Sequence, residues 1–234
     1  MSVFTYHLVR TSYSQAVNSI LFSVDKSEIP GLIHMKTMNC MRLGSAIFSV
    51  NRILIREISV FAQWEDEASI DKFLAENKFG KILSEGWHVR MSFMRQWGEI
   101  SEYEIPKTNR KMDEDETVVV VTLAKMKYFE IPRFIHWGRP VEKQVRDHSG
   151  KILSLASARF PRTVSTFSIW ENKKELMDMV HGNQSDPDSK RHFNAMKERE
   201  RRNFHKEFTT LRFRPIAEYG SWEGKTQLIP KFRK

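Results

Sequence analysis

The sequence predicts an α+β protein built from two copies of one unit. The copies are clearest in Arg56–Leu74 (REISVFAQWEDEASIDKFL) and Arg162–Val180 (RTVSTFSIWENKKELMDMV), which align without a gap. Five aligned positions are identical, namely the Arg, Ser, Phe, Trp and Glu of each copy. Each copy begins with the apolar alternation of a half-buried strand and changes to helical spacing after its Trp-Glu pair. A shared change of period at a shared register favours an internal duplication over coincidence.

The remaining segments repeat one order of elements around these two stretches. In the first unit we expect strands at 2–10, 32–38, 56–64 and 88–96, and helices at 12–23, 67–74 and 79–86. In the second we expect strands at 117–124, 151–158, 162–170 and 208–216, and helices at 129–146, 173–180 and 188–206. Trp137 to Pro140 should interrupt the helix at 129–146, because proline lacks the N–H that a helix interior uses. Asp66 and Asn172 stand where helix caps belong.

This order is the ferredoxin-like plan with antiparallel strands. Two such sheets can pack face to face and enclose a pocket between them. We therefore expect a first module at 1–101 and a second module at 117–224. Residues 102–116 (EYEIPKTNRKMDEDE) are polar and lack a hydrophobic period, so they should form the linker. Residues 225–234 should form a basic tail.

The formal net charge of +9 raises the question of nucleic-acid binding. The basic residues do not form an uninterrupted tract, however. The densest group, Lys190 to Arg202, contains Glu198 and Glu200, which is typical of the solvated face of a helix. No recognised nucleic-acid-binding motif accompanies the charge. We therefore expect no nucleic-acid partner.

The cysteine count and the hydropathy pattern exclude several other classes. Cys40 is the only cysteine, which excludes an internal disulfide framework and a Cys-rich zinc site. No stretch approaches the roughly 18 apolar residues of a membrane span. The N-terminal MSVFTYHLVRTSYSQ lacks the basic-then-apolar order of a signal peptide. These features predict a cytoplasmic protein without an integral membrane segment.

Several short motifs carry a resemblance to a known family. They are Ile29–Leu32 (IPGL), Phe61–Asp66 (FAQWED), Thr166–Glu171 (TFSIWE), the helix with His192, and Leu211–Phe213 (LRF) leading to Gly220–Trp222 (GSW). With these residues the sequence resembles the spheroidene monooxygenase family of carotenoid-modifying enzymes, in the dimeric α+β barrel superfamily. The resemblance implies tandem ferredoxin-like modules whose antiparallel sheets pack as a dimeric α+β barrel within one chain.

The same resemblance implies a function. It predicts an oxygen-dependent monooxygenase of a hydrophobic, carotenoid-like substrate, with haem as a candidate cofactor. Residues 39–52 (NCMRLGSAIFSVNR) contain one glycine where the family often has a Gly-rich segment. The alternative is therefore a non-catalytic barrel that binds a small hydrophobic ligand, and the sequence does not decide whether the chain is an enzyme. In either case a hydrophobic small molecule is the expected partner, and a homo-oligomer is a further candidate.

His192 is the candidate catalytic residue and the candidate ligand of a haem iron. In superfamily members that hold haem, a helical histidine of the barrel-forming half ligates the iron. His192 and His205 fall on one expected helix, where thirteen positions place them roughly 220° apart, so one pocket cannot use both. His192 borders the apolar side that includes Phe193 and Met196, whereas His205 should point away. The alternative for His192 is a core-boundary histidine with a satisfied hydrogen bond.

Two arginines are candidates for binding an acidic group of the cofactor. A guanidinium can hold a carboxylate, such as a haem propionate, through two parallel hydrogen bonds. Arg162 begins the second repeated strand, and Arg139 follows His136 and Trp137 on an expected helix. The alternatives are a charge that protects a sheet edge for Arg162 and a surface arginine for Arg139.

Overall fold

The computed structural model describes residues 2–21, 26–45, 49, 52–107, 110–182 and 190–232. The first half contains β1 (Val3–Arg10), α1 (Tyr13–Leu21), β2 (Leu32–Met41), β3 (Ile53–Trp64), α2 (Glu67–Glu76), α3 (Lys78–Ser84) and β4 (Trp87–Glu99). The second half contains β5 (Val118–Met126), α4 (Ile131–Asp147), β6 (Lys151–Arg159), β7 (Thr163–Trp170), α5 (Lys173–His181), α6 (Arg191–Arg201) and β8 (His205–Tyr219). Short 3₁₀ turns lie at Lys26–Glu28, Tyr128–Glu130 and Pro230–Phe232. The predicted α+β class and the antiparallel pairing are thus confirmed, while the duplication itself stays a prediction.

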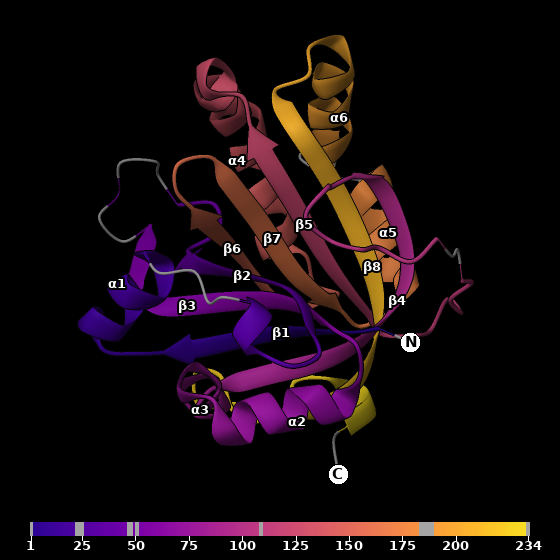
Figure 1. Ribbon diagram of the computed structural model, residues 1–234. Coiled ribbons are helices and arrows are strands. Elements are labelled where there is room, and N and C mark those ends of the chain that lie inside the picture. Colours follow the sequence, from indigo (N-terminus) through magenta and orange to yellow (C-terminus); the bar gives the residue numbers. More distant parts are fainter. Residues whose placement is uncertain are drawn as a thin grey trace.

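The strands form a single closed barrel in the order β1-β3-β2-β6-β7-β5-β8-β4. The four strands of each half are neighbours, and the halves join edge to edge where β2 pairs with β6 and β4 pairs with β8. Helices cover the outside of both halves (Figure 1). The predicted barrel is therefore present, but its two sheets join along their edges and do not pack as two separate face-to-face sheets. Closure pairs the edge strands of both sheets, which would otherwise expose unpaired backbone groups.

The barrel interior is filled with side chains. Phe4, Tyr6, Phe61, Phe167 and Phe213 all lie in one buried cluster. The rings of Tyr6 and Phe167 stack with centroids 3.9 Å apart, which ties the two halves together across the interior. Inward positions of small barrels are commonly filled in this way. Among the described residues, the space where a pocket between the two sheets was expected is thus occupied by packed core side chains.

Two segments outside the strands pack against the two ends of the barrel. After β4 ends, Ile100 and Tyr103 join the interior cluster, and the Tyr103 hydroxyl donates to the Phe61 carbonyl at 3.2 Å. Near the start of β4, Leu228 and Ile229 join the same cluster, and their backbone N–H groups donate to the Glu218 carboxylate. Parts of the predicted linker and tail thus contribute to the core.

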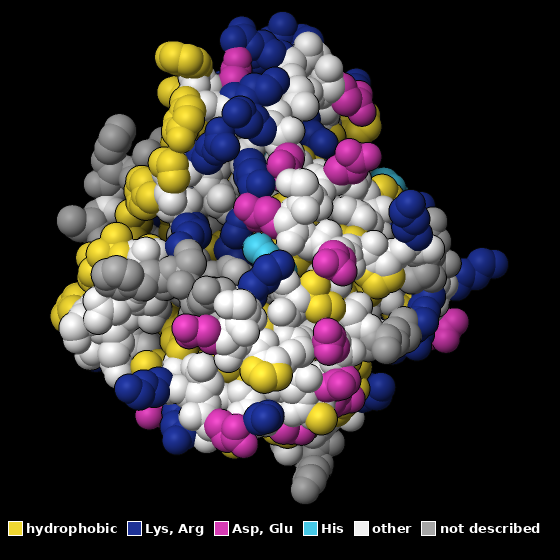
Figure 2. All heavy atoms as spheres, viewed as in Figure 1, with side chains coloured by type: hydrophobic (Ala, Val, Ile, Leu, Met, Phe, Trp, Pro, Cys, Tyr) yellow, Lys and Arg dark blue, Asp and Glu magenta, His cyan; other side chains and the backbone are white. Residues whose placement is uncertain are grey.

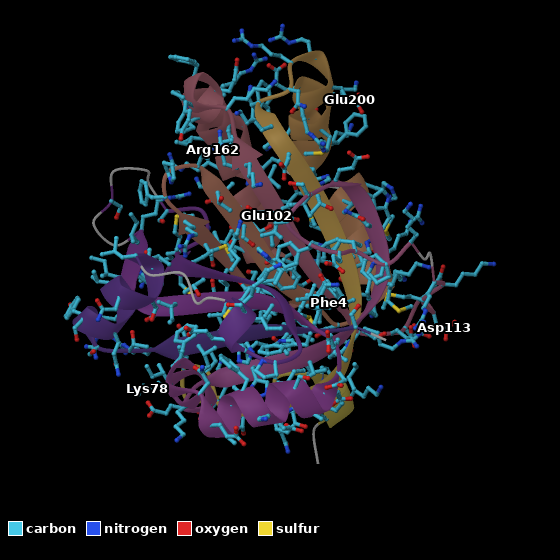
Figure 3. The ribbon with its side chains drawn as sticks, viewed as in Figure 1. Phe4, Lys78, Glu102, Asp113, Arg162 and Glu200 are labelled. Atoms are coloured by element: carbon cyan, nitrogen blue, oxygen red, sulfur yellow. The ribbon has the colours of Figure 1, made fainter. Side chains whose placement is uncertain are left out.

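Glu102 fixes the first of these segments in place. Its carboxylate pairs with Lys36 of β2, and it also pairs with Lys125 of β5 at 3.0 Å. Lys125 in turn reaches Glu207 of β8 at 3.1 Å. Figure 3 shows Glu102 near the centre of the molecule, above the strands of the first half. This network joins strands of both halves to the segment that follows β4.

Two helix predictions in the second half are wrong in detail. The helix α4 continues through Pro140, although this residue cannot donate the usual backbone hydrogen bond. The expected helix over 188–206 is in fact α6, which ends at Arg201, and His205 is the first residue of β8. The side chain of Asn203 accepts a hydrogen bond from the His205 N–H at 3.0 Å, which stabilises the turn into the strand. No helix among the described residues has both the length and the apolar character that a membrane crossing requires.

The helices cover the two halves differently. On the first half, Val60, Ala62 and Trp64 of β3 pack with Ile70 and Phe73 of α2 in one continuous outer cluster. On the second half, the outer core is divided into two smaller clusters, one around Trp170 and one around Phe204. A cavity lies on this outer face, beneath the helices.

Candidate functional site

The candidate site is a cavity of about 440 Å³ on the outer face of the second half. Its floor is formed by the outward positions of β5 to β8, and its roof by α4, α5 and α6. The floor is built mainly from small side chains, among them Ala124, Ala156, Ala158, Thr166 and Ser168. Small residues leave space below the helices that larger ones would fill.

The roof supplies larger apolar side chains. Phe134, Ile135 and Val141 come from α4, and Met196 comes from α6. The position of α4 is fixed by Gln144, whose side chain donates to the Met179 carbonyl at 2.8 Å and accepts from the His192 N–H at 2.9 Å. The three roof helices are thus joined to one another across the cavity. Such an arrangement can keep an apolar space open without collapse onto the sheet.

One side of the cavity is contributed by the first half of the chain. Met41 and Leu43 line it, together with Arg52. The Arg52 guanidinium forms a two-point ion pair with Glu142 of α4, with distances of 2.9 and 3.2 Å. Glu142 also accepts from the Gly44 N–H at 2.9 Å. Both charged groups are largely buried and mutually satisfied, so the pair fastens α4 to the β2–β3 connection.

His192 lines the cavity, as its predicted role requires. It lies at the start of α6 and is partly buried. Burial lowers its pKa, and a hydrogen bond to the backbone of Val180 opposes that shift. A histidine that donates one ring nitrogen to a carbonyl presents the other nitrogen as an acceptor or ligand.

His205 also lines the cavity, contrary to the helical-wheel argument. Its side chain is buried, and neither ring nitrogen has a hydrogen-bond partner. The rings of Phe134, Phe204 and Phe208 surround it at centroid distances of 4.6 to 5.6 Å. Burial, together with the nearby charges of Arg199 and Lys127, lowers the pKa of His205 to about 3. His205 is therefore a neutral imidazole at neutral pH whose nitrogens are free to meet a ligand.

The turn between β6 and β7 forms the rim of the cavity. Phe160, Pro161 and Arg162 all line it, and the Phe160 side chain is nevertheless 76% exposed. The Arg162 guanidinium lies 5.5 Å from the ring centroid of Tyr128, which follows β5. Figure 3 shows Arg162 at the upper ends of β6 and β7, beside α4. The structure thus brings Arg162 and His192 to one cavity.

Arg139 does not share this cavity. It lines a second hollow on α4 together with His136, Lys143 and Arg191. The structure therefore separates Arg139 from His192, with which it was predicted to act. Within the described ranges, no group of three or more His, Cys, Asp or Glu side chains is arranged to hold a metal ion.

Sequence reasoning missed two features of the site. It placed His205 on the wrong element because it extended the charged helix past Arg201. It also gave no role to Arg52 and Glu142, which are ninety residues apart and pair only in the folded chain. The first error had an available signal, since Asn203 is a residue type that commonly ends a helix. The second had none.

The sequence and the structure were compared with those of known proteins. No protein-family model matches the sequence, and no curated protein matches it significantly. An aldoxime dehydratase solved in complex with butyraldoxime has a TM-score of 0.55 and 9% identity, over 94% of this chain and 82% of that chain. This chain shares its overall fold with that structure. At this identity the likeness concerns the fold alone.

Two further solved structures share the arrangement more loosely. Another aldoxime dehydratase structure has a TM-score of 0.49 and 9% identity, over 92% of this chain and 80% of that chain. A ferredoxin-fold protein from Listeria monocytogenes, related to antibiotic biosynthesis monooxygenases, has a TM-score of 0.29 and 13% identity, over 93% and 97%. In this chain, each half contributes four strands interleaved with helices, and the strands of both halves close one barrel.

Proposed function

We propose that the cavity of the second half binds a hydrophobic, carotenoid-like molecule and that the chain is an oxygen-dependent monooxygenase, with haem as its candidate cofactor. The observation that carries the proposal is an apolar cavity of about 440 Å³ lined by two histidines, His192 and His205. Ligand sites are typically apolar cavities of this size with a few convergent polar groups. The pKa of each imidazole is lowered by burial, so both are neutral at neutral pH.

Two residues that line the cavity carry side chains of the kind that hold a haem. His192 is the candidate iron ligand, because its bond to Val180 orients the ring and leaves one nitrogen available. Arg162 is the candidate partner for a propionate at the rim. A bound haem supplies oxygen chemistry, which the protein tunes through its axial ligand and the polarity of the pocket.

His205 has a different role in this proposal. Its unpartnered nitrogens lie inside a group of aromatic rings, where water is excluded. A buried polar group without a partner costs free energy, and a ligand that offers a hydrogen bond removes that cost. His205 would therefore orient a polar atom of the bound ligand through a hydrogen bond to its neutral imidazole.

A haemin titration followed by absorption spectroscopy tests the cofactor assignment. Wild type should develop a Soret band with saturable binding, and His192→Ala should abolish it. His136→Ala is the matched control, since this histidine lies at the second hollow. Arg162→Ala should weaken binding and Arg139→Ala should not. If His205→Ala alone abolishes the band, His205 is the iron ligand; if wild type shows no band, haem is excluded.

Turnover is tested separately from haem binding. Wild type, a reductant, a carotenoid and ¹⁸O₂ should yield a product that carries the heavy oxygen. The alternative function is a non-catalytic carrier of hydrophobic molecules, which the mostly apolar lining supports without any chemistry. Quenching of the cavity tryptophan Trp137 by the carotenoid, with no oxygen incorporated, would establish the carrier instead.

A further inference from the structure

Large aromatic side chains are exposed beside the mouth of the cavity. Phe129 is 99% exposed and Tyr128 is 53% exposed, both in the turn between β5 and α4. Phe160, which is 76% exposed, lies in the β6–β7 turn. The two turns adjoin, because the Met126 N–H donates to the Arg162 carbonyl at 2.9 Å and Arg162 covers the Tyr128 ring. The three aromatic residues, called the aromatic rim below, therefore form one surface feature.

The aromatic rim belongs to the entrance of the cavity. Phe160 both lines the cavity and faces solvent, so the cavity opens at this turn. A hydrophobic molecule that enters here passes from the surface to the apolar floor along exposed aromatic rings. Exposed apolar patches with a polar border commonly mark surfaces that bind another apolar phase.

Basic side chains surround the aromatic rim. Lys127 precedes it, and its ammonium donates to the Asn203 carbonyl, which brings the end of α6 to the same edge. Five basic and two acidic side chains are connected at this edge, namely Lys127, Arg133, Arg162, Arg201 and Arg202 with Glu130 and Glu198. Figure 2 shows hydrophobic side chains along the upper left edge of the molecule, beside a group of Lys and Arg side chains.

The acidic members of this group are largely neutralised by pairing. Glu130 accepts from the Arg202 Nε at 2.8 Å, and Glu198 pairs with Arg133 and Arg201. Lys127 and Arg201 are exposed and can reach a second surface. An edge with insertable aromatic rings and surplus positive charge matches the chemistry of an anionic lipid bilayer.

We propose that the aromatic rim docks the protein on the surface of an anionic membrane, with Phe129 and Phe160 inserted among the acyl chains. Aromatic insertion provides apolar burial, while Lys127 and Arg201 contact lipid phosphates. The docked orientation sets the cavity mouth against the lipid. Entry of a hydrophobic substrate from the bilayer depends on the function proposed above. The docking itself depends only on the aromatic rim and the basic side chains around it.

Co-sedimentation with vesicles tests the docking directly. Wild type should sediment with vesicles of phosphatidylcholine and phosphatidylglycerol, and less with pure phosphatidylcholine. High salt should weaken binding, because exposed charges are screened. Phe129→Ser combined with Phe160→Ser should lower vesicle affinity by at least about tenfold, since two rings lose their apolar burial. Lys127→Gln and Arg201→Gln should each lower it by about fivefold.

Phe193→Ser is the matched control, because Phe193 is 47% exposed on α6 away from the rim and should leave vesicle affinity unchanged. Thermal melts confirm that each variant is folded. The proposal is overturned if wild type binds neither vesicle, or if the double variant binds as wild type does. It is also overturned if wild type is a dimer that Phe129→Ser dissociates, because the rim would then join two copies of the chain. Vesicle binding needs neither haem nor turnover, so its outcome is independent of the haemin titration.

Discussion

The outer faces of the two halves are built on the same strand pattern but carry different side chains. In the first half, Val60 and Ala62 of β3 are buried under α2 with Ile70. The aligned positions of β7 are Thr166 and Ser168, and both line the cavity. The inward positions are unchanged, since Phe61 and Phe167 are both fully buried in the barrel. One face of the strand thus preserves the barrel while the other determines whether a cavity exists.

The aligned arginines, Arg56 of β3 and Arg162 just before β7, show what the two halves retain. The Arg56 carbonyl accepts from the Thr11 N–H at 2.8 Å, and the Arg162 carbonyl accepts from the Met126 N–H at 2.9 Å. Each guanidinium lies 5.5 Å from a tyrosine ring centroid, Tyr13 for Arg56 and Tyr128 for Arg162. Arg162 lines the cavity of the second half, and Arg56 is not among the residues that line that cavity. Local geometry is therefore shared, and the function of a residue depends on how closely the helices cover its half.

The largest expected effect concerns the paired tryptophans, both fully buried. The indole N–H of Trp64 donates to Thr5 Oγ1 and that of Trp170 to Ser168 Oγ, each at 2.9 Å. Trp64→Ala and Trp170→Ala should each lower the free energy of unfolding by about 3–5 kcal/mol, because each leaves a cavity in a packed cluster. Urea denaturation measures this. Trp137→Ala is the control, because Trp137 lines the open cavity, and it should lower the free energy of unfolding clearly less. A decrease under about 1 kcal/mol for Trp64→Ala or Trp170→Ala would contradict their structural role.

A matched pair of alanines tests the packing difference itself. Ala62→Leu should destabilise the protein by about 1–3 kcal/mol, because the helices already fill the space above it. Ala156→Leu adds the same atoms at the cavity floor and should cost less than about 1 kcal/mol, since empty space receives them. It should also weaken binding of a hydrophobic ligand, as followed by tryptophan fluorescence. Equal losses of stability at the two sites would show that the cavity closes in solution.

These contrasts indicate which parts of the structure the sequence could predict. The repeated strand-helix junction carries its own periodicity, so the order of elements and the burial of Trp64 and Trp170 follow from local pattern. Barrel closure does not follow, because the pairing of β2 with β6 joins edges that are far apart in the chain, as in Cys40 with Ser157, which are 117 residues apart. His192 was found at the cavity because α6 has helical spacing there. His205 was misplaced because charged helical spacing was extended across Asn203.

The third prediction uses the buried histidines of the two halves. His7 in β1 and His205 in β8 both have ring nitrogens without partners, and burial lowers the pKa of each below its usual value. A lowered folded-state pKa means that the unfolded chain binds more protons. Stability is then complete above about pH 6.5 and falls as pH drops toward the folded pKa, which for His205 is about 3.

Because of His205 alone, the free energy of unfolding at pH 5 should therefore be up to about 2 kcal/mol lower than at pH 7.5. His205→Phe removes that term and should flatten the loss in urea denaturations at the two pH values. His136→Phe, at an exposed histidine, should keep the wild-type slope. A wild-type slope in His205→Phe would mean that the ring is hydrated. A ligand that hydrogen-bonds to His205 should change this pH dependence. A ligand in the cavity should not change the contribution of His7, because His7 does not line the cavity.

The smallest expected effect concerns a feature that the halves share. Asp66 caps α2 by accepting from the Ser69 N–H at 2.8 Å, and Asn172 caps α5 by accepting from the Glu175 N–H at 2.9 Å. Asp66→Ala and Asn172→Ala should each lower Tm by about 2–4 °C, because each leaves a helix N-terminus without its side-chain acceptor. Since the junctions match, the two losses should agree, even though one helix seals a packed face and the other roofs a cavity. A much smaller loss of Tm for Asn172→Ala would show that the helices of the second half are loosely packed as far as the junction after β7. The matching backbone geometry of the two caps argues against that outcome.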